Sequence, residues 1–224
     1  MSDDILSEQI AYYRARAQEY DESVFQTGRF APGQGGAVGL PDEFAFAKQM
    51  LRALGPVEEI LELACGTGIW TRDLVKVGQR VTALDASPEM LEVNARTVAD
   101  ARVRYQQADL FLWEPEQQYD LVFFGFWLSH VPPEALYAFL AKVQRAVRPE
   151  GRLFIVDQYA PLPGEELAAQ EGIHHTRTLY DGRAFTIVKV FYDTAMLAEK
   201  LAALGFETSV EKSGEYFFAL IGKR

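Results

Sequence analysis

The sequence predicts an α/β fold, a doubly wound and mostly parallel sheet with helices on both faces. Strand-like and helix-like segments alternate from residue 57 onward, and five strand-like runs are each joined to the next by a crossover segment. Such an alternation is typical of parallel sheets covered by helices on both sides. With 224 residues, of which 49% are hydrophobic, the chain can bury a large core. We expect a single domain over residues 1–224.

The elements of this sheet follow one another in order along the chain. Strands are expected at residues 59–64, 80–85, 103–109 and 119–126, and a fifth begins at Gly151. Helices are expected at residues 69–77, from Pro88, and along an apolar stripe of Leu136, Phe139, Leu140, Val143 and Val147. In sheets of this kind ligands bind at the carboxyl ends of the strands, where the strand order reverses.

The amino-terminal segments have patterns of their own. Residues 4–20 carry Ile10, Tyr13, Ala17 and Tyr20 at helical spacing, which predicts an amphipathic helix. Residues 26–41 contain five glycines and two prolines, too many for a regular element, and predict a long loop.

The carboxyl-terminal part departs from the alternation. Residues 160–192 are expected to be an insertion, in which two alternating runs at 176–192 meet at Asp181-Gly182, a two-residue hairpin signal. Residues 193–224 are expected to finish the sheet, with a helix at 194–204 and antiparallel strands near 206–212 and 215–222.

Composition argues against several classes of function. The chain has 22 basic and 32 acidic residues and a net charge of −10, which disfavours nucleic acid and anionic membranes as partners. Neither a basic secretory start nor a membrane-length apolar run is seen, and the single Cys65 fits a packing role in a reducing setting. We expect a cytoplasmic monomer or homodimer. His174 and His175 lack further ligands at metal-site spacing, so no metal is expected.

The glycine pair in ILELACGTGIW, residues 60–70, marks where a ligand approaches the backbone. Gly66 and Gly68 follow an apolar strand and let the chain turn steeply. A dinucleotide site would carry a third glycine where this chain has Thr71, which disfavours the alternative of a nicotinamide-dependent oxidoreductase. Asp85 ends the second strand, where a carboxylate suits ribose hydroxyls, and Asp109 ends the third, where an acceptor suits an adenine amine. Alternatively, both aspartates are strand-end caps.

Five motifs together carry a family resemblance. ELACGTG, LDASPEML, QADL, FWLSHVP and VRPEGRLFIVD resemble, in order, the motifs of class I S-adenosylmethionine-dependent methyltransferases over residues 57–158. The resemblance implies a seven-stranded sheet with one antiparallel strand, a cofactor-binding core at 57–158, and S-adenosylmethionine as cofactor. It implies methyl transfer to an oxygen, nitrogen or carbon atom of a small-molecule acceptor. Residues 1–45 would then be a lid over the cofactor. A non-catalytic cofactor binder with the same fold is the alternative.

The resemblance also implies a set of cofactor contacts. Glu62 and the glycines would hold the methionine part, Asp85 the ribose, Met90 the adenine ring, and Asp109 with the Leu110 N–H the adenine edge. The full set is Tyr12, Tyr13, Glu62, Ala64, Gly66, Gly68, Asp85, Ala86, Met90, Asp109, Leu110 and Phe126. For Tyr12 and Tyr13 the alternative is packing, because helical spacing places at least one of them in a core.

Four residues are candidates for the acceptor side. Trp127 and His130 follow the fourth strand, and His130 is a candidate general base because imidazole titrates near neutral pH. Alternatively, His130 only begins the helix that Pro132 and Pro133 introduce. Tyr180 and Arg183 on the hairpin are candidates to face an acceptor carboxylate, with a solvated sheet face as the alternative.

Overall fold

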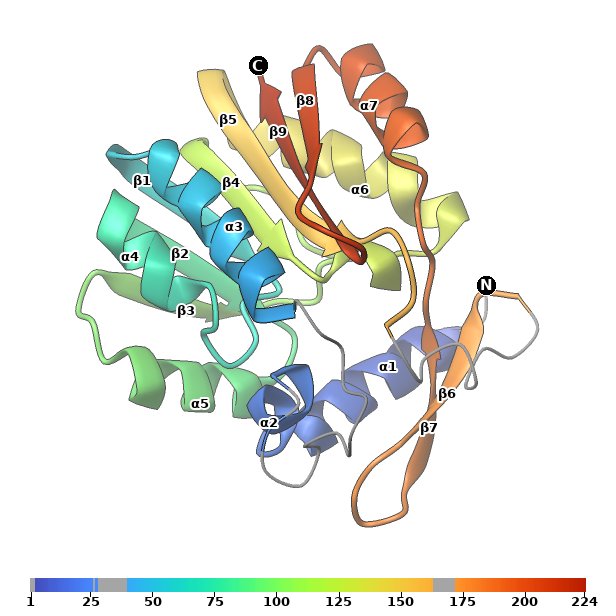
Figure 1. The fold of residues 1–224 in the computed structure, drawn as a ribbon. Helices are drawn as coiled ribbons and strands as arrows, with labels where there is room; N and C mark the ends of the chain where they lie inside the picture. The colour runs from blue at the N-terminus through green and yellow to red at the C-terminus, as the bar shows by residue number, and fades with distance from the viewer. Residues whose placement is uncertain (1–2, 26, 28–39, 163–171) are drawn as a thin grey trace.

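The computed structural model describes residues 3–25, 27, 40–162 and 172–224 and contains one large sheet (Figure 1). Its seven strands lie in the order β3-β2-β1-β4-β5-β9-β8. They are β1 (Val57–Leu63), β2 (Gly78–Asp85), β3 (Val103–Gln107), β4 (Tyr119–Gly125), β5 (Val147–Gln158), β8 (Glu207–Lys212) and β9 (Phe217–Lys223). Within this sheet β9 alone runs antiparallel to its neighbours β5 and β8. The predicted mostly parallel, seven-stranded sheet is confirmed.

Helices cover both faces of the sheet. On one face lie α3 (Leu40–Ala53) and α4 (Thr71–Val77), and on the other α6 (Pro133–Ala146) and α7 (Thr194–Ala203). The side-chain alternation of β1 explains the two layers, because Ile60 packs with the α3 and α4 side while Leu61 and Leu63 pack with the α6 and α7 side. Helix α5 (Pro88–Val98) lies along β2 and β3.

The start of α5 follows from its sequence. Ser87 is the N-cap, and its Oγ accepts a hydrogen bond from the Met90 N–H at 3.1 Å, while Pro88 occupies the first turn. The cap holds Met90 in the interior, where 2% of its surface is exposed. The predicted start at Pro88 is confirmed.

The centre of the sheet is the point where the strand order reverses. From β1 the chain proceeds to β2 and β3 on one side, and from β4 to β5 on the other. Ala64 follows β1 with φ 52° and Phe126 follows β4 with φ 56°. Positive φ is uncommon for such residues and clusters at functional sites, so the backbone is strained where the two central strands diverge.

The amino-terminal prediction needs two corrections. The expected single helix over 4–20 is two helices, α1 (Asp3–Arg16) and α2 (Tyr20–Val24). Of the predicted loop at 26–41, residues 40 and 41 begin α3, and the rest lies outside the described residues apart from residue 27. Helix α3 was not predicted, because Pro41 suggested a loop, although proline is tolerated in the first turn of a helix.

The predicted hairpin is present as a separate two-stranded sheet, β6 (His174–Thr178) and β7 (Ala184–Val188). The prediction of a two-residue turn at Asp181-Gly182 was wrong. The Leu179 N–H donates to the Arg183 carbonyl at 2.8 Å, so residues 180–182 form a longer loop. Gly182 alone adopts positive φ, 87°, which is typical of the three-residue hairpin with a bulge.

Helix α1 and this hairpin lie together beyond the carboxyl ends of the central strands (Figure 1). Two side chains of α1 bind the backbone of β7. Glu8 Oε1 accepts from the Thr186 N–H at 2.6 Å, and Gln9 Oε1 accepts from the Val188 N–H at 3.0 Å. The first helix is therefore fixed to the hairpin, next to the edge where a ligand is expected.

Candidate functional site

A pocket opens at the carboxyl ends of β1, β2 and β4 and brings together most of the predicted site residues. Those that line it are Tyr13, Ala64, Gly66, Asp85, Ala86, Met90, Asp109, Leu110, Phe126, Trp127 and His130. The pocket is also lined by six residues that were not predicted, Gln9, Ile10, Tyr20, Ser87, Phe111 and Gly125. Ile10 and Tyr20 lie at the same helical spacing as Tyr13. This spacing could have indicated that they line the pocket, but it was interpreted only as the apolar face of a helix.

The two glycines of the loop after β1 serve different purposes. Gly66 lines the pocket with φ +51°, and no described atom lies within 4 Å of the position a Cβ would take. Gly68, with φ +93°, faces the interior, where a Cβ would lie 2.7 Å from Asn94 Oδ1. Gly66 therefore leaves space for a ligand, whereas Gly68 permits α5 to pack closely against the loop.

A buried polar network supports this loop from behind. Asn94 Nδ2 donates to the Gly66 carbonyl at 3.2 Å and to Thr71 Oγ1 at 2.9 Å, and Thr71 donates to Glu62 Oε2 at 2.6 Å. Burial raises the pKa of Glu62 to about 8. Thr71, at the position of the third glycine of a dinucleotide loop, thus binds Glu62 through its hydroxyl. Glu62 and Gly68 stand behind the pocket rather than in its described lining.

Asp85 joins the two loops that border the pocket. The Gly66 N–H donates to its Oδ2 and the Ser87 N–H to its Oδ1, each at 2.9 Å. Burial raises the pKa of Asp85 to about 6. Asp109 also accepts a backbone hydrogen bond, from the Phe111 N–H to its Oδ1 at 2.9 Å. Both aspartates therefore cap the turns after their strands, as the alternative interpretation held, and both also line the pocket.

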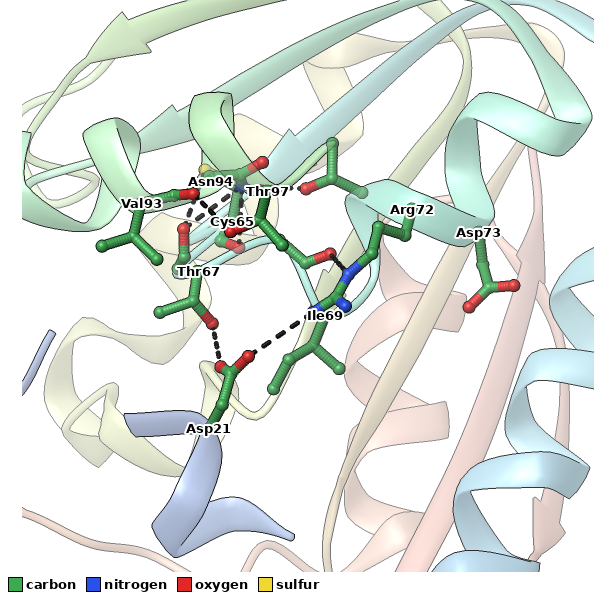
Figure 2. Close-up of polar contacts among 12 residues, drawn as sticks. Asp21, Cys65, Thr67, Ile69, Arg72, Asp73, Val93, Asn94 and Thr97 are labelled. Carbon is green, nitrogen blue, oxygen red and sulfur yellow. Dashed lines mark hydrogen bonds and ion pairs between the residues drawn. The ribbon is translucent and has the colours of Figure 1, made fainter. Parts of the chain in front are cut away.

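Helix α2 contacts the glycine loop through one carboxylate, as Figure 2 shows. Asp21 accepts a hydrogen bond from the hydroxyl of Thr67, the residue between the two glycines. It also forms an ion pair with Arg72, whose Nη2 lies 3.4 Å from Asp21 Oδ2. Arg72 Nε also donates to the Gly68 carbonyl at 3.2 Å. The amino-terminal segment is thus tied to the loop. The lid role of residues 1–45 stays a prediction.

His130 is held in one defined tautomer. Its Nδ1 lies 2.7 Å from the Val188 carbonyl oxygen and its Nε2 lies 2.7 Å from Tyr13 Oη. A carbonyl only accepts, so Nδ1 carries the proton, Nε2 accepts, and the Tyr13 hydroxyl donates. Burial lowers the pKa of His130 well below its usual value, and the charges of Lys189 and Arg177 lower it further. His130 is therefore neutral near pH 7, and its role as a base stays a prediction.

Trp127 offers an unused donor beside this pair. The residue lines the pocket, its ring packs against Phe111 at 5.5 Å between centroids, and its Nε1 is buried with no hydrogen-bond partner among the described residues. Buried donors are usually satisfied, so an indole N–H with no described partner, on a residue that lines the pocket, is a candidate donor to a ligand.

Besides Glu62 and Gly68, three further predicted residues do not line the pocket that the described residues form. Tyr12 has 4% of its surface exposed and packs with Leu179 and Ile187 of the hairpin, as its alternative interpretation held. Tyr180 is 68% exposed, and Arg183 pairs with Asp181 at 2.7 Å, both in the hairpin loop. Neither residue lines the pocket that the described residues form, and the acceptor contacts expected from them stay a prediction.

Two kinds of feature are absent from the described part of the chain. No group of three or more potential metal ligands gathers there. Nor is any helix in those ranges long and apolar enough to cross a membrane.

Comparisons with known proteins place these observations in a family context. Residues 60–151 match the family described as "Methyltransferase domain". A solved structure of DhpI in complex with SAM and a compound abbreviated HEP is 39% identical, covers 100% of both chains and has a TM-score of 0.84. A second DhpI structure holds SAH, with 38% identity, coverage of 99% of this chain and 98% of that one, and a TM-score of 0.80.

Curated relatives agree with these structures. An uncharacterized methyltransferase of Synechocystis is 32% identical over 152 residues, which cover 61% of this chain and 71% of the relative. A demethylmenaquinone methyltransferase of Tropheryma whipplei is 30% identical over 108 residues, which cover 45% of this chain. The match spans only 41% of the length of that relative.

Proposed function

Because this chain belongs to the class I S-adenosylmethionine-dependent methyltransferases, we propose that it transfers the cofactor's methyl group to a negatively charged oxygen of a small acid. Structures of the similar protein DhpI hold S-adenosylmethionine or its product, which supports this cofactor and sets the nicotinamide alternative aside. The observation that carries the choice of acceptor is the positive charge gathered around His130 in a chain of net charge −10.

The cofactor half of the pocket is proposed to lie along the ends of β1, β2 and β3. Asp85 would accept hydrogen bonds from the ribose hydroxyls, Met90 would pack on the adenine, and Asp109 with Leu110 would hold the adenine edge. Gly66 would leave room for the methionine part. When bound, the cofactor supplies a methyl group on a positively charged sulfur.

The acceptor half is proposed to lie by Trp127 and His130. Three positive charges act on His130 and lower its pKa, those of Lys189, Arg177 and Arg16. The carboxylate of Asp157 interacts with Lys189 and offsets part of its charge. A positive potential of this kind attracts an anionic acceptor. The buried Nε1 of Trp127 would donate to one of its oxygens.

An anionic oxygen also fits the weak basicity of the site. Carboxylate and phosphoryl oxygens carry their lone pair before they bind, so alignment with the methyl group is the main requirement. A neutral hydroxyl would need a proton acceptor, and His130 resists protonation with its Nε2 already bound by Tyr13. The non-catalytic alternative predicts cofactor binding without product for every acceptor. The absence of a nucleic-acid partner and the monomer or homodimer state stay predictions.

Replacing Arg177 with glutamine tests the acceptor class. We expect the KM of an acid acceptor to rise severalfold, because the loss of one positive charge weakens the potential that attracts an anion. The Kd of S-adenosylmethionine should change less than this KM. Methyl ester formation, followed by mass spectrometry over paired acids and alcohols of equal size, provides the measurement.

The matched control is Arg183→Gln, since Arg183 lies on the same hairpin but pairs with Asp181 in the loop. It should leave the KM unchanged. The proposed acceptor class is wrong if alcohols are methylated as fast as their matched acids, or if the two arginine variants behave alike.

A further inference from the structure

We propose that helix α1 makes the pocket selective for the charged form of the cofactor, because Tyr13 gives its hydroxyl proton to His130 and turns only oxygen lone pairs toward the pocket. The sulfonium of S-adenosylmethionine is positive, whereas the thioether of the product S-adenosylhomocysteine is neutral. Tyr13 would thus favour binding of the substrate cofactor and release of its product. This inference rests on the proposed function of the pocket.

Hydrogen bonds link the Val188 carbonyl, His130 and Tyr13 in series, and the carbonyl fixes which atom donates in each bond. The Val188 carbonyl can only accept, so it takes the Nδ1–H of His130 at 2.7 Å. The remaining nitrogen, Nε2, then has no proton and takes the hydrogen of Tyr13 Oη at 2.7 Å. The opposite tautomer would set a nitrogen lone pair against the carbonyl oxygen and leave a buried acceptor unsatisfied.

Gln9 of α1 binds the backbone of both Val188 and His130 and so holds this series of hydrogen bonds in place. Its Oε1 accepts from the Val188 N–H at 3.0 Å and its Nε2 donates to the His130 carbonyl at 3.3 Å. Only 2% of Gln9 is exposed, so these bonds are shielded from water. Helix α1 therefore carries both Tyr13 and the side chain that fixes the partners of His130.

The surrounding charges preserve this polarity. A protonated His130 would donate from Nε2 and make Tyr13 an acceptor, which would turn its hydroxyl proton toward the pocket. Lys189, Arg177 and Arg16 oppose that protonation, and burial opposes it most. The cations proposed to attract the acceptor thus also keep the oxygen of Tyr13 available as an acceptor.

Among the α1 residues that line the pocket, only Tyr13 offers an oxygen to a cation, because Ile10 is apolar and the Gln9 amide is bonded to Val188 and His130. Phe126 and Trp127 present aromatic rings, and the partnerless polar atom of Trp127 is a donor, which does not favour a cation. Tyr12, one position along, faces the hairpin core instead of the pocket. Tyr13 is therefore the residue of α1 whose loss is expected to change discrimination between the two cofactor forms.

The test is calorimetric titration of the unliganded protein with S-adenosylmethionine and with S-adenosylhomocysteine. For Tyr13→Phe we expect affinity for the methylated form to fall about five- to tenfold and affinity for the product to change less than about twofold. Tyr12→Phe removes the same atom from the same helix and should leave the ratio of the two dissociation constants unchanged. Equal changes for both ligands, or none, would overturn the inference.

Two variants of His130 separate this role from that of a base. In His130→Gln the amide oxygen can still accept from Tyr13 but cannot take up a proton, so the preference for the charged cofactor should persist. In His130→Ala the preference should be lost. If both variants lose it equally while Tyr13→Phe keeps it, the inference fails. Failure of the wild-type protein to bind either ligand would instead refute the proposed function.

Discussion

Replacing Asp85 with alanine is expected to lower the affinity for S-adenosylmethionine by roughly a hundredfold or more. The lost hydrogen bonds to the ribose hydroxyls are charge-assisted, and such bonds contribute about 1.5 to 3 kcal/mol. The structure adds a second cause. The same carboxylate accepts from the Gly66 and Ser87 N–H groups, so its removal frees both loops that border the pocket.

The pKa of Asp85 gives this result a pH dependence. Burial raises the pKa to about 6, above its usual value, so the carboxylate is charged near neutral pH and becomes protonated as the pH falls through that value. Affinity of the wild-type protein should therefore decline as the pH is lowered below about 6, and Asp85→Ala should remove that dependence.

Calorimetry with Asp100→Ala as the matched control completes this experiment. Asp100 precedes β3, pairs with Arg102 at 2.6 Å and does not line the pocket, so its loss should leave the dissociation constant unchanged. An Asp85→Ala protein that folds and binds the cofactor like the control would contradict the ribose assignment.

Changing Gly68 to alanine is expected to reduce stability, whereas changing Gly66 to alanine is expected to reduce cofactor binding. For Gly68→Ala, φ +93° is strained for a side chain, and the new Cβ would lie 2.7 Å from Asn94 Oδ1 and 3.0 Å from Val98 Cγ2. Left-handed strain of about 1 to 2 kcal/mol and overpacking of about 1 to 3 kcal/mol should reduce the free energy of unfolding by about 2 to 5 kcal/mol. Natural domains have only about 5 to 15 kcal/mol of stability, so the effect is large.

For Gly66→Ala we expect a loss of cofactor affinity rather than of stability. No described atom lies within 4 Å of the added Cβ, so only the strain of φ +51° opposes folding. The methyl group would instead occupy the pocket and reduce cofactor affinity at least about tenfold, if the cofactor approaches the backbone there. Urea unfolding and calorimetry on both variants provide the comparison. Unimpaired binding by a folded Gly66→Ala protein would show that the cofactor lies elsewhere.

Much of the pocket could be predicted because its residues sit at strand ends. Asp85 ends β2 and Asp109 follows β3, the adjacent parallel strand. The carboxyl ends of such strands meet at one edge, so their joint presence in the pocket follows from the pattern. Met90 follows from the cap that Ser87 and Pro88 provide. These relations are local or are set by sheet topology, and the sequence contains both kinds of information.

Other features depend on contacts between distant segments. Helical spacing could not decide between Tyr12 and Tyr13, because the position of the hairpin determines which ring is covered. Hydrogen bonds from Asn94 to Thr71 and from Thr67 to Asp21 join elements that no periodicity relates. The tautomer of His130 depends on the Val188 carbonyl, 58 positions along the chain. The alternation of a hairpin does not indicate where its loop points, so the sequence could not place Tyr180 and Arg183 relative to the pocket.

The most direct test of this account is a crystal structure of the protein soaked with S-adenosylhomocysteine. We predict electron density for the ligand in the described pocket, with the ribose at Asp85, the adenine against Met90, and the sulfur on the side of Tyr13 and His130. Ligand density at another site, or an empty pocket at saturating ligand in a protein shown to be folded, would contradict the account.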